Sequence, residues 1–327
     1  MRTKQILLIA LSTLVVVELI ILAQTGFSIS NKRTSPLHSE ETPEQNLEIA
    51  KLKEKLKENP ENTEIFIQLA NLYFNKGKYA EAEDLLTSAL NIEPKNEGAL
   101  LTLAHVYRYQ YKFPESENLY LQALNNSPAN EMIYIELGKL YRNWEKFDKA
   151  EDSFMKAAAL NPDNDLIFGY GLGYLYRDMG EYQKAEAMFK KALVLNPSEF
   201  NYMGLGDIYR DLENYEESEK MFMKALEINP DSEAYLGLGW LYFNQKRYDE
   251  AEKAFKEFLS RIRPKGEVYY ALSQVYLRQE RLGTAEEMLK KSIELAPSSE
   301  AYTSLAELYK SQGRSEEAEK IINKTSN

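Results

Sequence analysis

Cysteine is absent from this chain of 327 residues, and histidine is nearly absent. The absence of cysteine excludes disulfides, thiolate zinc sites and cysteine nucleophiles. The only histidines are His38 and His105, so most metal sites and most histidine-dependent acid–base chemistry are excluded as well. Basic residues are outnumbered, because 40 Lys and Arg stand against 51 Asp and Glu. The net charge of -11 argues against nucleic-acid binding, which needs cations that displace counterions from phosphates.

Apolar residues are not scarce: they make up 44% of the chain, and they begin with a long run from Ile6 to Ala23. As a helix this run would span roughly 27 Å, close to the thickness of the hydrocarbon core of a bilayer. We therefore predict a transmembrane signal-anchor over residues 1–23. The alternative is a cleaved signal peptide, but the run is longer than usual, and Ile21 stands where a small residue is preferred before a cut after Ala23.

The charges that flank this run predict its orientation. Arg2 and Lys4 precede it closely, whereas Lys32 and Arg33 follow it at a distance. Positive charge favours the cytoplasmic side, so we expect a single-pass membrane protein whose remaining residues lie on the exported side. If the run is removed as a signal, the protein would instead be secreted or periplasmic.

Two segments separate the apolar run from the rest of the chain. Residues 24–43 are rich in Ser and Pro and poor in large apolar side chains, which is typical of a flexible linker. Residues 44–59 show a helical pattern of apolar residues with lysines on the other faces. We interpret them as a helix that caps the structure that follows.

Most of the prolines recur at a fixed interval. They are Pro60, Pro94, Pro128, Pro162, Pro197, Pro230, Pro264 and Pro297. The successive spacings are 34, 34, 34, 35, 33, 34 and 33 residues. A period near 34 indicates an array of structural repeats rather than two or three ordinary globular domains.

A second column of residues recurs in phase with the prolines, with the pattern leucine, small residue, two variable residues and tyrosine. Leu137, Gly138 and Tyr141 are one example. Each unit holds two amphipathic helices separated by a short break such as Lys76-Gly77-Lys78, and so short a break forces antiparallel neighbours. We expect the small residue to let the partner helix approach closely and the tyrosine hydroxyl to reach a polar edge.

These columns resemble the tetratricopeptide repeat, a helix–turn–helix unit of about 34 residues. The third unit carries the whole pattern: Tyr134, Leu137, Gly138, Tyr141, Ala150, Phe154, Ala157 and Pro162. The resemblance implies an all-α, right-handed superhelical solenoid over residues 60–327, with seven full repeats and a truncated eighth. It also implies that the first helices line a concave groove that binds protein or peptide. The RNA-binding pentatricopeptide relatives share the period, but the acidic composition disfavours them.

The position after the repeat tyrosine is arginine in four successive units: Arg108, Arg142, Arg177 and Arg210. The resemblance places this column in the groove, where guanidinium groups would pair with carboxylates of an acidic partner. The aromatic residues expected to face the same groove are Tyr170, Tyr174, Trp240 and Tyr270. The alternative is that internal ion pairs occupy the arginines, with Asp178, Asp211 and the second-helix glutamates as partners. The sequence leaves both alternatives open.

No catalytic set stands out in the sequence. The glycine-rich run from Gly169 to Gly173 looks like a phosphate-binding loop, but the repeat places it inside a first helix, where close packing explains it better. We therefore predict a non-enzyme without metal or cofactor, which acts as a protein-binding scaffold or adaptor at a membrane. The alternative is a non-catalytic structural subunit or assembly factor of a secretion or envelope complex.

Overall fold

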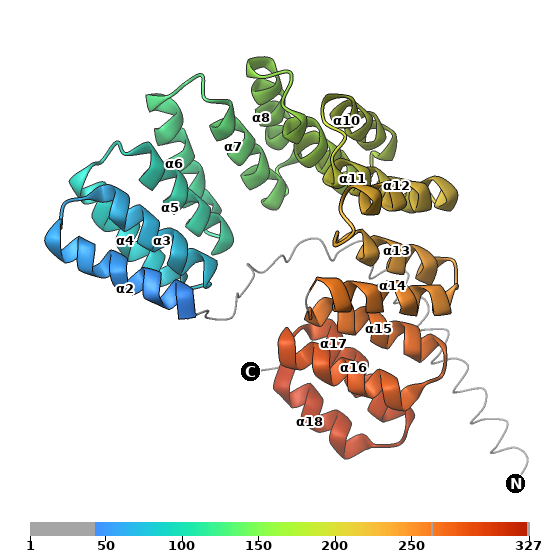
Figure 1. The fold of residues 1–327 in the computed structure, drawn as a ribbon. Helices are drawn as coiled ribbons and strands as arrows, with labels where there is room; N and C mark the ends of the chain where they lie inside the picture. Colours follow the sequence, from blue (N-terminus) through green and yellow to red (C-terminus); the bar gives the residue numbers. More distant parts are fainter. Residues whose placement is uncertain (1–42, 263, 326–327) are drawn as a thin grey trace, which may run out of the picture. The chain divides into compact units, whose positions relative to one another are not determined.

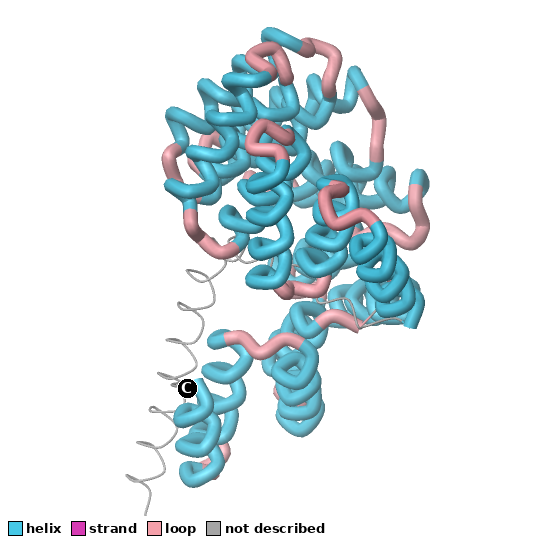
Figure 2. Tube along the Cα trace, turned by 90° about the vertical axis from the view of Figure 1, so that its left-hand side faces the viewer, coloured by secondary structure: helices cyan, strands magenta, loops and turns pink. Residues whose placement is uncertain are grey.

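The computed structural model describes residues 43–262 and 264–325, and within these ranges the chain consists of helices joined by short loops (Figures 1 and 2). The predicted signal-anchor over residues 1–23, and all but the last residue of the predicted linker, lie outside the described residues. Among the helices that are described, none combines the length and the apolar character needed to cross a bilayer.

After α2 (Pro43–Glu58), the helices alternate as first and second members of antiparallel pairs. The first helices are α3 (Thr63–Asn75), α5 (Glu97–Tyr109), α7 (Glu131–Asn143), η3 (Ile167–Gly173) continued by α9 (Tyr174–Asp178), α11 (Glu199–Asp211), α13 (Ala234–Asn244), α15 (Gly266–Arg278) and α17 (Ser299–Ser311). The second helices are α4 (Tyr79–Ile92), α6 (Phe113–Asn126), α8 (Phe147–Leu160), α10 (Tyr182–Leu195), α12 (Tyr215–Ile228), α14 (Tyr248–Arg261), α16 (Leu282–Leu295) and α18 (Ser315–Thr325). The described chain thus has the paired-helix architecture that the repeats predict, while its superhelical handedness stays a prediction.

Helix α2 occupies the segment predicted as a capping helix and begins one residue earlier. Its apolar face is buried against α3, where Ile49 and Leu52 form a cluster with Ile65 and Leu69. The ammonium group of Lys53 lies 5.6 Å from the centroid of the Tyr73 ring, so the lysine stem also covers α3. The apolar face of the first repeat is therefore covered on its N-terminal side.

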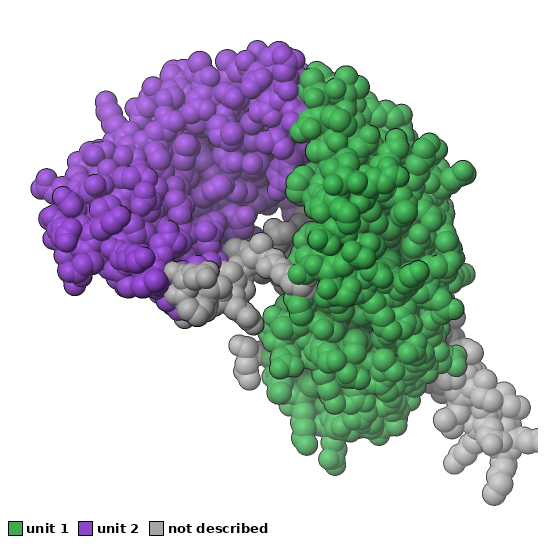
Figure 3. Space-filling view, in the orientation of Figure 1, with its two compact units in different colours: residues 1–16, 176–327 green, residues 17–175 purple. Residues whose placement is uncertain are grey.

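The described residues divide into two compact units, which we treat separately (Figure 3). The N-terminal unit comprises residues 43–175, and the C-terminal unit comprises residues 176–325 without residue 263. The repeat pattern alone predicts one continuous array and does not indicate this division.

Glycines of the first helices lie against phenylalanine rings of the second helices, which confirms the expected close approach. In the N-terminal unit the Phe154 ring lies between Gly138 and Gly171, where an added Cβ would come within 2.6 and 2.8 Å of ring carbons. In the C-terminal unit Phe222 takes the equivalent place between Gly206 and Gly237. One ring thus packs on its own repeat and on the next, and real Cβ atoms do not tolerate contacts below 3.0 Å.

The repeat tyrosines join neighbouring repeats through hydrogen bonds to glutamates, so the polar edge expected from the sequence is a carboxylate. Each hydroxyl donates to a glutamate of the preceding second helix. The pairs are Tyr107–Glu83, Tyr141–Glu117, Tyr209–Glu186, Tyr242–Glu219, Tyr276–Glu252 and Tyr309–Glu286. In five of them a lysine or arginine pairs with the glutamate and lies over the tyrosine ring: Lys112, Lys149, Arg247, Arg281 and Arg314.

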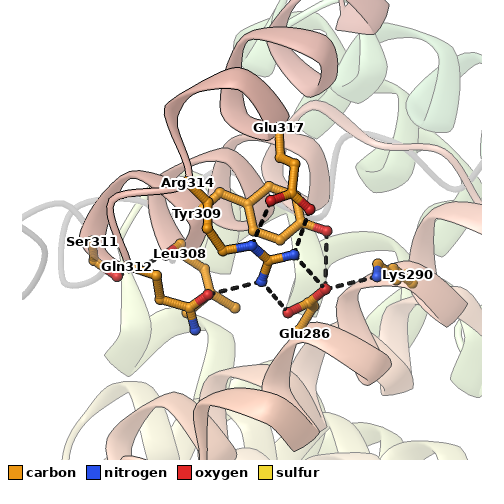
Figure 4. A network of polar contacts seen from close by, with 8 residues as sticks. All are labelled: Glu286, Lys290, Leu308, Tyr309, Ser311, Gln312, Arg314 and Glu317. Atoms are coloured by element: carbon orange, nitrogen blue, oxygen red, sulfur yellow. Dashed lines mark hydrogen bonds and ion pairs between the residues drawn. The ribbon is translucent and has the colours of Figure 1, made fainter.

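The last of these networks is the most extensive (Figure 4). Arg314 donates to Glu286 at 2.6 Å and to Glu317 at 2.6 Å, and its guanidinium carbon lies 4.1 Å from the centroid of the Tyr309 ring. Lys290 donates to the same Glu286 at 2.7 Å. The hydrogen bond from Arg314 is the main reason that the pKa of Glu286 falls to about 2. The carboxylate is therefore held ionised where two repeats meet.

Candidate functional site

The four predicted arginines lie in the last turns of their first helices, two in each unit. Arg108 belongs to α5 and Arg142 to α7, whereas Arg177 belongs to α9 and Arg210 to α11. Their shared position after the repeat tyrosine does not give them shared contacts.

In the C-terminal unit the two arginines form a network with two aspartates of α11. Arg177 Nε donates to Asp211 at 2.6 Å, and its Nη1 lies 3.5 Å from Asp207. Arg210 Nη2 lies 2.8 Å from Asp207 and 3.7 Å from Asp211. Only 14% of the Arg177 side chain and 8% of the Arg210 side chain are exposed. At these two positions the structure agrees with the ion-pair alternative, with Asp211 as the expected partner and Asp207 as one that sequence reasoning missed.

In the N-terminal unit Arg108 is also covered, with 10% of its side chain exposed. Its guanidinium lies 3.6 Å from Glu136 and over the Tyr109 ring. Glu136 also contacts His105 at 2.8 Å and Lys139 at 2.7 Å. Burial by itself would raise the pKa of Glu136, but the hydrogen bond to His105 and the nearby charges of Lys139 and Arg108 lower it to about 2. Arg108 therefore belongs to a cluster around an ionised carboxylate.

The first helix of the fourth repeat departs from α-helical geometry. Over residues 167–173 it is a π-helix, in which the Tyr174 amide donates to the Gly169 carbonyl five residues back as well as to the Gly171 carbonyl. In an α-helix that amide would donate to Tyr170, four residues back. The glycine-rich run is thus part of a first helix, as predicted, but its π-helical form was not predicted.

Arg142 contacts the carbonyl that this change of geometry makes accessible. Its Nη1 donates to the Tyr170 carbonyl at 3.1 Å. Its guanidinium carbon lies 5.6 Å from the centroid of the Tyr170 ring and 5.9 Å from that of Tyr174. Lys139, three residues earlier on α7, places its ammonium group 5.3 Å from the Tyr170 centroid. Three of the predicted site residues therefore meet here, together with a lysine that was not predicted.

The two tyrosines form a surface that solvent reaches. Their rings meet edge to face, with centroids 5.7 Å apart. Tyr170 is 49% exposed, so about half of its side chain is accessible beside the two cations. We call the set of Lys139, Arg142, Tyr170 and Tyr174 the tyrosine–cation cluster.

The remaining predicted site residues, Trp240 and Tyr270, pack against the apolar core of the C-terminal unit. Trp240 makes edge-to-face contacts with Phe243 and Phe255, at centroid distances of 5.5 and 5.4 Å. Burial raises the pKa of the Tyr270 hydroxyl. Both side chains are partly buried, so packing accounts for much of their surface.

A spacing rule identifies the site residues that were missed. Lys139 precedes Arg142 by three residues, and Asp207 precedes Arg210 by three, so each pair shares one helix face. Within residues 43–325, as far as they are described, no group of three or more carboxylates or histidines is placed to hold a metal ion.

Comparison with known proteins assigns repeats along most of the described chain. Sequence profiles of the tetratricopeptide repeat match residues 49–91, 98–125, 133–164, 170–199, 199–263, 266–299 and 299–324. No curated protein sequence matches the chain.

Solved structures with the same architecture are numerous. A tetratricopeptide repeat protein from Parabacteroides merdae is 25% identical, with a TM-score of 0.61 over 75% of this chain and 98% of that one. Yeast Tom70 is 18% identical, with a TM-score of 0.66 over 85% of this chain and 59% of that one. PilW, a type IV pilus biogenesis factor, is 20% identical, with a TM-score of 0.54 over 64% of this chain and 98% of that one. The last two likenesses show the fold alone.

Proposed function

Since the chain belongs to the tetratricopeptide-repeat family, whose members generally mediate protein–protein interactions, we propose that it is a scaffold or adaptor that binds a segment of a partner protein on the first helices of its N-terminal unit. The main support for a partner-binding surface is the tyrosine–cation cluster. Tyrosine and arginine are enriched at the centres of protein interfaces, because the tyrosine ring buries a large area and the planar guanidinium stacks on rings and pairs with carboxylates through two hydrogen bonds.

The arginines of the column support this proposal unequally. Arg177 and Arg210 already contact two carboxylates and are mostly covered, so a partner would have to displace internal ion pairs to reach them. Tyr170, by contrast, exposes about half of its surface beside Lys139 and Arg142. We therefore place the binding surface on α7, η3 and α9, at the residues of the cluster.

Site-specific photo-crosslinking tests this placement. A photoreactive phenylalanine analogue replaces Tyr170 in one variant and Tyr111 in another, because Tyr111 is 64% exposed but lies in the turn between α5 and α6. In cells that make the full chain, we expect a discrete crosslinked partner from position 170 and none from position 111. Equal crosslinking at both positions, or none at position 170, would contradict the proposed surface.

We also propose that residues 1–23 anchor the chain in a membrane with the repeats on the exported side. The support is the apolar run and its flanking charges. Full-length protein should then remain in the membrane fraction after carbonate extraction, and a protease added outside the membrane should reach the repeats. A mature protein that begins near Gln24 would favour the secreted or periplasmic alternative.

A further inference from the structure

We infer that the π-helical segment η3 makes the tyrosine–cation cluster selective for an acidic segment that also presents a flat apolar side chain. This inference rests on the proposed function and names the chemistry of the segment that is bound. The occupant is a stretch of a partner protein in which a carboxylate stands next to an aromatic residue.

The π-helical segment η3 coincides with one added residue in the fourth repeat. The spacing from Pro162 to Pro197 is 35 residues instead of 34, and the extra residue lies between Pro162 and Leu172. The corresponding distance in the third repeat, from Pro128 to Leu137, is one residue shorter. A π-turn accommodates one added residue inside a helix, so the insertion becomes a change of helix geometry rather than a longer loop.

The added residue changes the hydrogen bonding of the Tyr170 carbonyl. Because the Tyr174 amide donates to Gly169, the Tyr170 carbonyl is available to accept from Arg142. This hydrogen bond holds the guanidinium beside the rings of Tyr170 and Tyr174. The π-helix therefore sets the place of the cation as well as that of the aromatic surface.

The surface of the cluster combines positive charge with an aromatic face. Lys139 and Arg142 place positive charge within 6 Å of the centroid of the exposed Tyr170 ring. The carboxylate that contacts Lys139 is Glu136, which also contacts Arg108 and His105. The single negative charge of Glu136 is therefore shared among these three side chains. A carboxylate of the partner is complementary to the two cations, and a ring beside it stacks on or against Tyr170. We expect tight binding to require both the carboxylate and the ring of the partner, because the two cations lie next to the face of Tyr170.

Fluorescence anisotropy on the full chain tests the selectivity with three labelled peptides. One alternates Asp and Phe, one alternates Asn and Phe, and one alternates Asp and Ser. We expect the Asp–Phe peptide to bind at least tenfold more tightly than either of the others, and added salt to weaken its binding. Failure of the Asp–Phe peptide to bind, or equal binding of the Asp–Phe and Asn–Phe peptides, would overturn the inference.

Single substitutions test whether the Asp–Phe peptide binds at the tyrosine–cation cluster. Tyr170→Ala and Lys139→Gln should each weaken Asp–Phe binding about tenfold. The control is Lys112→Gln, because Lys112 also lies over a tyrosine ring, that of Tyr107, but in a contact between repeats. Equal weakening by Lys112→Gln, or unchanged binding after Tyr170→Ala, would contradict the assignment.

Deletion of Gly169 tests the role of the π-helix itself. It restores the usual spacing, so η3 should become α-helical and the preference for Asp–Phe over Asn–Phe should fall to less than threefold. A deletion variant that keeps the full preference would show that the π-helix is not needed; one that fails to fold leaves the substitutions above to decide. The outcomes also separate the two proposals, because crosslinking at position 170 without peptide selectivity would leave the proposed function standing.

Discussion

The arginines that follow the repeat tyrosine make different contacts in different repeats. Arg108 in the N-terminal unit is mostly covered beside a carboxylate, as Arg177 and Arg210 are in the C-terminal unit, whereas Arg142 is not described by that pattern. In the C-terminal unit Arg177 and Arg210 meet Asp207 and Asp211, and all four side chains are mostly covered. In the N-terminal unit Arg142 contacts a backbone carbonyl and two tyrosine rings, one of which is half exposed. The repeat position thus places each arginine in the last turn of a first helix, and the residues around it, on its own helix or on the next first helix, determine its contacts.

Removal of Arg210 should have the largest effect on stability. Arg210→Ala leaves the Asp207 carboxylate mostly covered and without its nearest cation, so we expect a loss of about 3 kcal/mol in the free energy of unfolding. The control is Lys220→Ala in the same unit, which breaks an exposed pair with Glu217 and should cost at most about 1 kcal/mol. Urea denaturation measures both, and similar losses would remove the distinction between a covered network and a surface pair.

The glycine–phenylalanine contacts should respond alike in both units, in contrast to the arginines. Gly138→Ala would place Cβ 2.6 Å from the Phe154 ring, and Gly239→Ala would place it 2.3 Å from Phe255. We expect each to lower the unfolding free energy by about 1–3 kcal/mol. Gly283→Ala, in the first turn of α16 with open space around it, should instead be neutral or stabilise by up to about 1 kcal/mol. Thermal melts that rank Gly283→Ala with the other two would contradict this packing.

Arg142→Ala removes a hydrogen bond to the Tyr170 carbonyl and contacts with two tyrosine rings, and we expect it to cost less than Arg210→Ala. The expected loss is about 1 kcal/mol. Hydrogen exchange should show faster exchange of the amides in η3, while amides of α11 keep their protection. Faster exchange throughout both units would mean that Arg142 supports more than the π-helix.

Acid should reveal an effect that the two units share. Glu136 in the N-terminal unit and Glu286 in the C-terminal unit both have a pKa of about 2, below the usual value of 4.5. A folded-state pKa below the unfolded one contributes stability that is present above pH 4.5 and is lost as the pH falls towards 2. Glu136→Gln and Glu286→Gln should each flatten the fall of stability over this range. An unchanged pH profile in either variant would show that its carboxylate is not held ionised.

Much of the fold follows from local sequence. The proline spacing and the column of leucine, small residue and tyrosine predict the helix pairs, because helix periodicity and short breaks act within a few residues. Gly138 was expected at a close contact and lies against Phe154. The tyrosine hydroxyls were expected at a polar edge, but not at Glu83 or its equivalents, since these lie on another helix.

The candidate site was less predictable. The resemblance to the tetratricopeptide repeat predicted that Arg142, Tyr170 and Tyr174 face one groove, and in the structure the Arg142 guanidinium lies beside both tyrosine rings. The added residue was visible as a spacing of 35, yet spacing alone does not distinguish a longer loop from a π-turn. Whether a longer loop or a π-turn forms depends on whether the helix remains packed around the added residue. Gly171 in η3 does remain packed against the Phe154 ring.

The sequence by itself determined that this chain is a series of paired helices, which residue of each unit lies in the core, and which position carries arginine. These properties depend on side-chain periodicity along single helices. The tertiary structure alone decided that Arg177 meets Asp211 and that Arg142 meets the Tyr170 carbonyl. Those partners are 34 and 28 residues apart in the chain, and they meet only when one repeat stacks on the next. The sequence around a charged residue does not identify the partner that this residue contacts in the neighbouring repeat.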